Sequence, residues 1–531
     1  MTINKLNIMK FFNIKLITAI LSVMFVVGLS TSCISDLDVE PIDPSVTQTF
    51  DQDGVFTKIY ASLALTGQEG PAGNGDVDGI DEGTSAFVRL IWNLNELTTD
   101  EAICSWGDPG IAEMNFNRWS SSHDQITGVY GRFYFNVTLC NHFLEQTQGQ
   151  TDEKTVKQRA EARFMRALNY YYLMDFFGNV PFTEVVALEA PTQISRTDLF
   201  NYIEKELTES EADMYEPKAA PYYRADKVAN WLLKSRLYLN AEVYTGTAKW
   251  SEAATYAKKV MDSAYKLNPE YTHLFMGDNS GSGVNKAPQE IILPIAADGI
   301  KTKSYGTSLF LIASTRTSGM PNWGSNDGWG GNRARAALVK KFFPDGNIPE
   351  NAKLTPATTG AADKRALFFI DDRTLEIENV EIFKQGYSVM KFSNVRADGS
   401  TPNDLVFTDM DVPFFRAAEA YLTYAEATLR AGGSSNDALT ALNALRSRAN
   451  APLFTAVDLD RILDEKAREF YFEGHRRTDL IRYGYYGGGD YNWDWKGGSP
   501  SGTKFSAIYN LFPIPSTDMN SNENLDQNPG Y

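Results

Sequence analysis

Apolar residues recur with helical spacing in several long segments of the chain. Over residues 161–182, Phe164, Leu168 and Tyr171 repeat every three to four positions, so one broad face of a helix would be buried. Gly178 follows as the expected left-handed stop of this helix. Small residues stand between the rings and allow a second helix to pack closely. We therefore expect this segment to form half of a helical hairpin.

The same pattern predicts helices at 50–65, 126–147, 198–214, 225–244, 250–264, 412–432, 437–449 and 459–482. We expect Thr197 to cap the helix over 198–214, and Pro413 to lie in the first turn of the helix over 412–432. Helix pairs with short turns, in which small and large residues alternate, are typical of tetratricopeptide-like repeats. The sequence therefore predicts a mainly α fold in which helical hairpins form a scaffold.

The pattern changes between residues 269 and 408. Residues 290–295 have the composition of a buried strand, and sequence rich in Gly, Ser, Asn and Trp follows them. Loops that are positioned by a rigid scaffold commonly carry binding residues. We therefore predict an irregular, loop-rich binding lobe at about 269–408.

A second Gly-rich stretch, over residues 67–83, predicts a long loop, and long ordered loops are usually functional. Its acidic residues match the first half of an EF-hand calcium loop. The twelfth position, however, is Ser85 instead of the glutamate that binds calcium with both oxygens. A solvated, turn-rich loop is therefore favoured over an EF-hand.

The N-terminus has the features of a targeting segment. Lysines precede an apolar run over 16–29, which is too short for a membrane span and typical of a signal peptide. Small residues lead to Cys33 as in a bacterial lipobox, although Ser30 stands where leucine is usual. We predict a lipoprotein signal peptide over 1–32, an acylated tether over 33–49 and one folded domain over 50–531. An ordinary secretory signal with an incidental cysteine is the alternative.

Composition narrows the possible functions. Hydrophobic residues make up 43% of the 531 residues and charged residues 22%, which is typical of a globular protein. The net charge of −17 argues against a nucleic-acid partner, because no basic patch is present to displace counterions. After Cys33 only Cys104 and Cys140 remain, which is no disulfide framework, and the sequence does not decide whether they pair.

The sequence contains no recognisable catalytic motif. The four histidines have no metal-ligand spacing, and there is no Gly-x-Ser-x-Gly elbow or phosphate loop. A helical scaffold with surface loops favours recognition without turnover, so we predict that the protein is not an enzyme. A glycan hydrolase stays the alternative, because the carboxylates are too numerous to exclude a catalytic pair by counting.

Several motifs resemble the SusD/RagB family of outer-membrane nutrient-binding lipoproteins over the whole mature length. They are CISDLD at 33–38, RFMRA at 163–167, FGNVP at 177–181, FRAAEAY at 415–421, EFYFEGHR at 469–476, and PIP at 513–515 with QNPGY at 527–531. Within the family the chain is most similar to the starch-binding member, through RADK at 224–227 and NWDWKGG at 492–498.

The resemblance implies a lipid-anchored protein on the cell surface of the outer membrane. It would capture starch or maltooligosaccharides and deliver them to a SusC-like TonB-dependent transporter. A SusD-like binder of another glycan or of peptides is the alternative within the family.

Charged residues inside these motifs lie on helices whose other positions are apolar. We therefore expect them to form ion pairs between helices and not to act as catalytic groups. They are Arg166, Arg416, Glu419, Glu473, Arg476 and Asp479.

Sugars present apolar C–H faces and many hydroxyls, so a binding site needs aromatic faces and a few polar groups. Trp106, Tyr305 and Trp329 lie in loop-like sequence, where a core ring would be out of place. By the resemblance they form a curved aromatic platform, and Arg89 donates hydrogen bonds to glucose hydroxyls. The family's asparagine after the first tryptophan is absent here, but Asp108 can accept the same hydroxyl protons.

No cofactor is required for binding of this kind. The resemblance implies a structural calcium at Asp278, Asp409 and Asp411, which lie in loops between elements, and carboxylates are suitable ligands for that ion. Solvated loop acids are the alternative.

Overall fold

The computed structural model describes residues 49–349 and 361–531. The chain divides into a first unit, Met1–Asp51, and a second unit, Gln52–Tyr531. All elements described below belong to the second unit. The predicted signal peptide, Cys33 and nearly all of the predicted tether lie outside the described residues.

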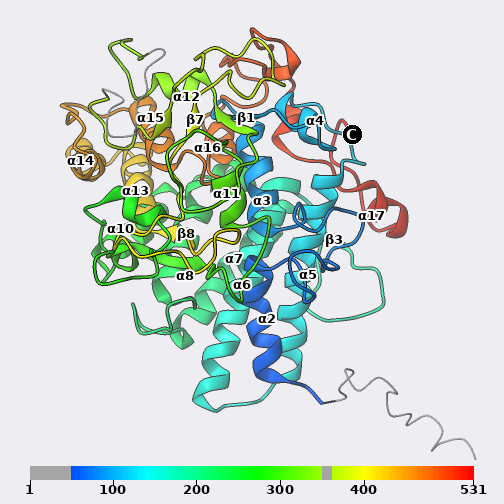
Figure 1. Ribbon diagram of the computed structural model, residues 1–531. Helices are drawn as coiled ribbons and strands as arrows, with labels where there is room; N and C mark the ends of the chain where they lie inside the picture. The colour runs from blue at the N-terminus through cyan, green and yellow to red at the C-terminus, as the bar shows by residue number, and fades with distance from the viewer. Residues whose placement is uncertain (1–48, 350–360) are drawn as a thin grey trace, which may run out of the picture. The chain divides into compact units, whose positions relative to one another are not determined.

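Three long helices lie side by side: α2 (Gln52–Ala64), α5 (Asp124–Gln146) and α6 (Glu153–Phe177) (Figure 1). The Asp152 side chain caps α6 by accepting a hydrogen bond from the Thr155 backbone N–H at 3.0 Å. Gly178, with φ of 73°, ends the helix where the sequence predicts a stop. The rings on its apolar face are buried, as the predicted hairpin requires.

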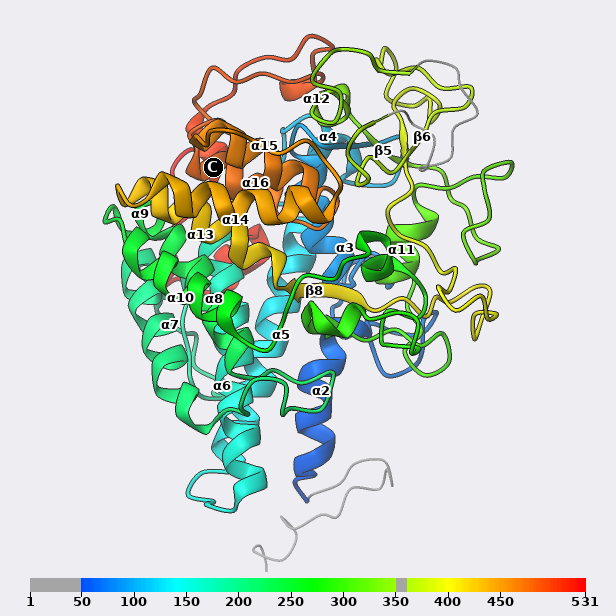
Figure 2. The ribbon, with the colours of Figure 1, turned by 90° about the vertical axis from the view of Figure 1, so that its left-hand side faces the viewer.

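Further helices pack in succession against this group (Figures 1 and 2). Helix α7 packs on α6, α10 packs on both α8 and α13, and α14 packs on α13. The mainly α fold with helical hairpins is therefore confirmed. These helices are α7 (Arg196–Ser210), α8 (Lys227–Leu239), α9 (Ala241–Thr245), α10 (Trp250–Asp262), α13 (Ala418–Arg430), α14 (Ser435–Arg448), α15 (Leu459–Phe470) and α16 (Arg476–Arg482).

Two helix boundaries differ from the prediction because of local hydrogen bonds. Helix α7 is capped by Ser195, whose hydroxyl accepts from the Asp198 N–H at 3.1 Å, so Thr197 lies inside the helix. The single helix predicted over 225–244 is two helices, α8 and α9, which meet at Asn240. Short polar side chains commonly satisfy nearby backbone groups in this way.

Two other predictions are wrong because of contacts between distant residues. Residues 412–416 form strand β8 (Val412–Arg416) instead of the first helical turn, since they pair antiparallel with β4 (Ile291–Ile295). The helix predicted over 459–482 is interrupted between α15 and α16 at Phe472 and Gly474, which have φ of 64° and 81°. The Gly474 N–H donates to the buried Glu96 carboxylate at 2.6 Å, a partner far away in the sequence.

The described part of residues 269–408 contains only short elements, in agreement with the predicted irregular lobe. They are η3 (Tyr271–Phe275), η4 (Ala287–Gln289), β4, α11 (Ser308–Ala313), β5 (Asn332–Ala334), α12 (Ala336–Lys340), β6 (Phe368–Phe369) and β7 (Ser388–Val389). Strand β5 pairs with β1 (Ala102–Cys104), so this region is joined to an early part of the chain.

The remaining elements are short as well. Near β1 lie α3 (Phe87–Trp92), the π-helical turn η1 (Asn93–Leu97) and α4 (Ile111–Asn115). The others are β2 (Val180–Pro181), β3 (Gln193–Ile194), η2 (Glu211–Asp213), η6 (Lys496–Gly498), η7 (Ala507–Asn510) and α17 (Ser516–Ser521).

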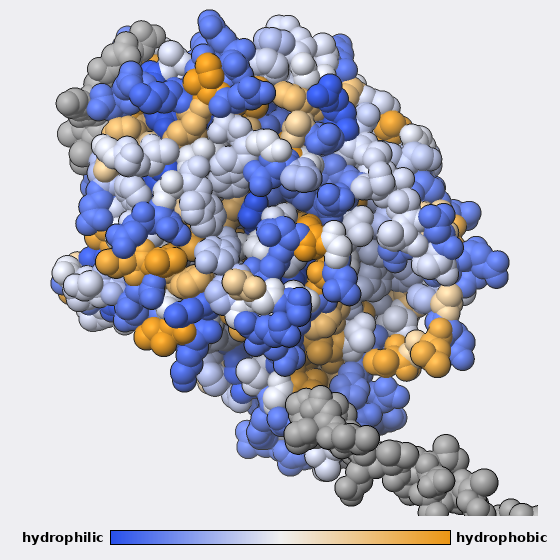
Figure 3. Space-filling view, turned by 45° about the vertical axis from the view of Figure 1, so that its right-hand side comes forward, coloured by the Kyte–Doolittle hydropathy of each residue, from blue (hydrophilic) through white to orange (hydrophobic). Residues whose placement is uncertain are grey.

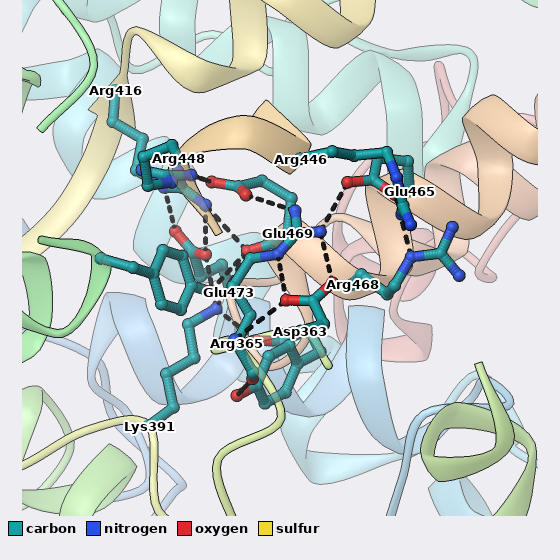
Figure 4. Close-up of polar contacts among 12 residues, drawn as sticks. Asp363, Arg365, Lys391, Arg416, Arg446, Arg448, Glu465, Arg468, Glu469 and Glu473 are labelled. Carbon is teal, nitrogen blue, oxygen red and sulfur yellow. Dashed lines mark hydrogen bonds and ion pairs between the residues drawn. The ribbon is translucent and has the colours of Figure 1, made fainter. Parts of the chain in front are cut away.

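The charged residues of these motifs form buried ion pairs, as predicted, but Arg416 lies on strand β8 and Glu473 lies between α15 and α16, so these two are not on helices. Arg416 contacts Glu473 at 2.7 Å and Glu290 at 3.1 Å, and both it and Arg365 reach Glu469 on α15 (Figure 4). The other expected residues are paired too, in Arg166–Glu206, Arg236–Glu419, Arg476–Asp100 and Asp479–Lys466. These contacts connect helices, strands and loops inside the second unit.

Cys104 and Cys140 are both free and buried, so the structure contains no disulfide between them. Over residues 49–349 and 361–531, none of the helices is long and apolar enough to cross a bilayer. On the face shown in Figure 3, hydrophobic residues lie in small groups among polar ones.

Candidate functional site

The pairing of β1 with β5 brings two of the predicted rings together. The strands are antiparallel, with Cys104 opposite Asn332, and the Ser105 N–H continues the pairing by donating to the Gly331 carbonyl at 3.1 Å. Trp106 follows β1 by two residues and Trp329 precedes β5 by three. Because the strands run in opposite directions, both rings lie at the same end of the pair.

The Trp106 ring is half-buried and has partners on two sides. Its centroid is 6.4 Å from that of Trp329 and 6.3 Å from that of Phe310 on α11. Its indole N–H donates to the Trp329 carbonyl at 3.4 Å. A side chain at Gly331 would overlap the Trp106 ring, so glycine is required at that position for this arrangement.

The segment that carries Trp329 is fastened to the end of α11. The Trp329 N–H donates to the Ala313 carbonyl at 2.8 Å, and the Gly330 N–H donates to the Arg316 carbonyl at 2.9 Å. The Trp329 ring itself is half-buried. A backbone held in this way presents the ring at a defined position, although the segment has no regular secondary structure.

Arg89 and Tyr305 are joined through their backbones. Arg89 lies on α3, and its backbone N–H donates to the carbonyl of Gly306, the residue after Tyr305, at 3.1 Å. The half-buried Tyr305 ring packs against Phe407 with a centroid distance of 5.2 Å. The Gly83 backbone passes close to both Tyr305 and Gly306, where a larger residue would clash.

All five residues predicted to bind ligand line one surface hollow of about 540 Å³. The structure therefore brings together Arg89, Trp106, Asp108, Tyr305 and Trp329, which are spread over 241 residues of sequence (89 to 329, inclusive). The Gly-rich loop that we expected to be simply solvated lines the same hollow, through Pro71, Ala72, Asp81, Glu82 and Gly83. The length of this loop indicated a function, but nothing in the sequence indicated that the loop lies beside the predicted binding residues.

Arg89 provides the positive charge of the hollow. Its side chain is only 8% exposed, and the guanidinium lies 5.5 Å from the centroid of the Trp106 ring and 5.3 Å from that of Phe310. Burial lowers the pKa of Arg89, whereas the nearby carboxylates of Asp81 and Asp108 act to raise it. Its Nε–H has no hydrogen-bond partner among the described residues.

Glu82 is the second unusual group of the hollow. Its pKa is raised to about 7, chiefly by burial and also by the neighbouring Asp81 carboxylate, while Arg132 opposes the shift. Its Oε1 atom is buried without a hydrogen-bond partner in the described part of the chain. Glu82 was not identified from the sequence, because its burial depends on how the loop folds.

The arrangement suits a ligand that has both apolar faces and hydroxyl groups. Three half-exposed rings can cover C–H surfaces, an arginine can donate hydrogen bonds, and carboxylates can accept them. Such a combination is typical of a pre-formed small-molecule site with few polar groups.

A larger hollow, of about 730 Å³, lies between α8, α10 and α13 and holds none of the predicted site residues. Its tryptophan, Trp231, donates its indole N–H to Glu211 at 2.8 Å, and Lys259 lies 5.4 Å from the ring centroid. Since the smaller hollow alone gathers the two tryptophans, the tyrosine and the arginine predicted to bind ligand, we place the candidate site there.

The three aspartates predicted to bind calcium do not form one group of ligands. Asp278 uses both oxygens to accept hydrogen bonds, from Ser282, Asn285 and the N–H groups of residues 397 and 398. In the described part of the chain, no group of three or more His, Cys, Asp or Glu side chains could hold a metal ion.

Asp409 and Asp411 differ from Asp278, since each has one buried oxygen without a hydrogen-bond partner among the described residues. Burial raises the pKa of Asp411 to about 8. A carboxylate oxygen without a partner is a suitable ligand for a hard cation, whereas both oxygens of Asp278 are already engaged. Calcium binding stays a prediction.

Comparisons with known proteins agree on one family. The profile of the SusD family matches residues 369–531, and a second profile, described as starch-binding associating with outer membrane, matches residues 37–258. The protein named Starch-binding protein SusD from Bacteroides thetaiotaomicron is 46% identical over 533 residues, which cover 94% of this chain and 96% of that protein. A SusD-like protein from Bacteroides ovatus is 26% identical and covers 68% of this chain and 66% of its own length.

Solved structures show the same fold at lower identity. A SusD-like carbohydrate binding protein from Bacteroides fragilis superposes with a TM-score of 0.69 at 20% identity, over 90% of this chain and 98% of that one. Surface glycan-binding protein A from Bacteroides uniformis gives a TM-score of 0.65 at 20% identity, with the same coverage.

Proposed function

Since the chain belongs to the SusD family, we propose that it binds starch and maltooligosaccharides in the hollow formed by Arg89, Trp106, Asp108, Tyr305 and Trp329. The observation that carries the proposal is the convergence of three half-exposed rings and one buried arginine on a single hollow. The relative that is 46% identical over 94% of the chain is named for starch binding, which supports this choice of ligand. Another glycan is the alternative within the same site.

The rings are expected to supply most of the affinity. A desolvated aromatic anchor commonly accounts for about 2 kcal/mol or more of binding free energy, against under about 1 kcal/mol for a peripheral contact. Trp329→Ala and Trp106→Ala should therefore each weaken the binding of maltoheptaose by roughly thirtyfold. Isothermal titration calorimetry measures the change directly.

Trp250→Ala is the matched control, because Trp250 begins α10 and does not line the hollow. This variant should keep the affinity for maltoheptaose and lower the thermal stability instead, since the ring packs within a helical repeat. If Trp329→Ala and Trp106→Ala both bind as tightly as the parent protein, the proposed site is wrong.

We also propose that the protein binds its glycan without cleaving it. A glycosidase needs two carboxyl groups, one protonated and one ionised, on either side of the scissile bond. Among the described residues that line the hollow, only Glu82, Asp81 and Asp108 carry carboxyl groups, so a hydrolase at this site would have to use two of them. Maltoheptaose recovered after long incubation with the calorimetry sample should chromatograph unchanged, and shorter products that disappear in Glu82→Gln would establish a hydrolase.

The cellular role is proposed from the family and the N-terminal sequence. We place the protein on the outer membrane, anchored by a lipid on Cys33, where it passes captured glycan to a SusC-like TonB-dependent transporter. The profile described as associating with outer membrane supports this location. A helical scaffold that presents a hollow lined by aromatic rings suits capture at a surface, and the predicted anchor would hold the protein there.

A further inference from the structure

We propose that Asp81, Glu82 and Asp108 form an acidic wall that makes the hollow selective for neutral glycans and excludes glycans that carry carboxylate, sulfate or phosphate groups. The inference rests on the proposed glycan-binding function and names the chemical class of its ligands. It adds Asp81 and Glu82 to the residues that face the sugar.

The wall is built from two separate segments of the chain. Asp81 and Glu82 end the Gly-rich loop just before α3, and Asp108 follows Trp106 by two residues. All three line the same hollow as the rings. Among the described residues that line it, Arg89 is the only base, so acids outnumber bases by three to one.

The single positive charge is already offset. Asp81 and Asp108 are both close enough to Arg89 to act on its charge. The guanidinium also lies 5.5 Å from the centroid of the Trp106 ring and 5.3 Å from that of Phe310, so it is partly covered from the rest of the hollow. A neutral sugar is not repelled by the carboxylates around Arg89, whereas an anionic sugar is.

Asp81 and Glu82 both have capacity left for a sugar hydroxyl. Asp81 is held in place by Thr84, whose backbone N–H and hydroxyl donate to Oδ1 at 3.0 and 2.9 Å. No hydrogen bond within the described residues occupies its Oδ2. Glu82 can accept from a hydroxyl when ionised and donate to one when protonated, and its pKa of about 7 makes both forms available near neutrality.

Neither protonation state of Glu82 favours an anionic ligand. Ionised Glu82 repels the anion directly, and when Glu82 is protonated the carboxylates of Asp81 and Asp108 still outnumber the one positive charge of Arg89. Two like charges within a few ångströms in a partly desolvated hollow repel strongly enough to cost about tenfold or more in affinity. The wall is not a cation site, since the described residues include no group of three such side chains that could hold a metal ion.

The test compares maltoheptaose with maltoheptaose in which C6 hydroxyls have been oxidised to carboxylates. Calorimetry at pH 7.5 and low ionic strength should show at least about tenfold tighter binding of the neutral glycan to the parent protein. Asp81→Asn and Glu82→Gln should each reduce this ratio by about threefold or more, and added salt should reduce it as well.

Asp78→Asn is the matched control, because Asp78 carries the same charge on the same loop but does not line the hollow. The ratio of its affinities for neutral and oxidised maltoheptaose should equal that of the parent protein. Equal binding of both glycans to the parent protein, or an equal loss of selectivity in Asp78→Asn and Asp81→Asn, would overturn the wall and leave the proposed function intact. A folded parent protein that does not bind maltoheptaose would instead overturn the proposed function, and the wall with it.

Discussion

The Trp106 ring can lie beside Trp329 only because residue 331 has no side chain. The Gly331 Cα faces the indole so closely that a Cβ would overlap three of its atoms. The Arg89 guanidinium in turn packs against the same indole. One glycine therefore sets the position of a ring and, through that ring, the surroundings of the only base in the described lining of the hollow.

Gly331→Ala should therefore displace the Trp106 ring. We expect maltoheptaose affinity to fall by about tenfold or more, since an aromatic anchor moved out of place loses much of its contact energy. Calorimetry measures the affinity, and the intrinsic tryptophan fluorescence should change as well.

Gly107→Ala is the matched control for this prediction. It adds the same methyl group next to Trp106, but a Cβ at Gly107 would have no atom within 4 Å. The affinity of this variant should stay within about twofold of the parent. If Gly331→Ala binds maltoheptaose as the parent does, the position of Trp106 is not important for binding.

At the scale of elements, buried ion pairs connect parts of the second unit that no sheet or long helix joins. Glu469 on α15 lies between Arg365, Arg416 of β8 and Arg448 of α14 (Figure 4). Burial by itself would raise the pKa of Glu469, but the attraction of these three arginines outweighs it and holds the pKa well below the usual range. Similar attractions lower the pKa of Glu465 to about 2.

Glu469→Gln should destabilise the protein strongly, because it leaves three buried arginines with one anion fewer. Removing one partner of a buried ion pair commonly costs about 3–5 kcal/mol. Chemical denaturation measures the free energy of unfolding. Glu376→Gln is the control, since its pair with Lys340 is on the surface, with the Glu376 side chain 64% exposed, and should change stability by about 0.5 kcal/mol or less.

The same ion pairs make the stability of the folded protein depend on pH. A carboxylate whose pKa is lowered in the folded state stabilises that state above its unfolded pKa, and this stabilisation is lost as the pH falls through the folded value. For Glu465 the loss should run from about pH 4.5 down to about pH 2. A midpoint of acid unfolding that is identical in Glu469→Gln and in the parent would contradict this role of the network.

At the scale of the whole molecule, the second unit begins at Gln52, well after Cys33. The core, the ion pairs and the hollow all belong to that unit. The location of the protein in the cell and its binding of glycan should therefore be separable by mutation.

Cys33→Ala should release the protein from membranes, because it removes the predicted site of acylation. Membrane fractionation followed by immunoblotting measures the release. The soluble variant should bind maltoheptaose with the parent's affinity and unfold at the same temperature. If the variant partitions with membranes as the parent does, the predicted lipid anchor is wrong.

Local sequence alone was sufficient for much of the scaffold. The apolar spacing of residues 161–177 and the stop at Gly178 describe the longer, C-terminal part of α6 correctly, because a helix is built from contacts between residues three and four apart, although the helix begins earlier, at Glu153. The motif charges were correctly interpreted as ion pairs, since a buried charge among apolar residues must find a partner whether it lies on a helix, as Arg476 does, or on a strand, as Arg416 does.

The larger errors have one physical cause, which is pairing between residues far apart in the sequence. The cap of α7 and the break at Asn240 were decided by local hydrogen bonds instead. Strand β8 is a strand because β4 lies beside it, and the interruption before α16 is held by Glu96. No local pattern contains such a partner, and so none of these features can be read from the segment by itself.

The candidate site divides in the same way. The identities of Arg89, Trp106, Asp108, Tyr305 and Trp329 came from motifs and from family resemblance, without any knowledge of their distances. Their convergence on one hollow was decided by the β1–β5 pairing and by the backbone contact between α3 and Gly306. Only the tertiary structure placed Asp81 and Glu82 in the lining of the hollow. The burial of a side chain and the charges beside it depend on the folded chain, so they cannot be read from its position in the sequence.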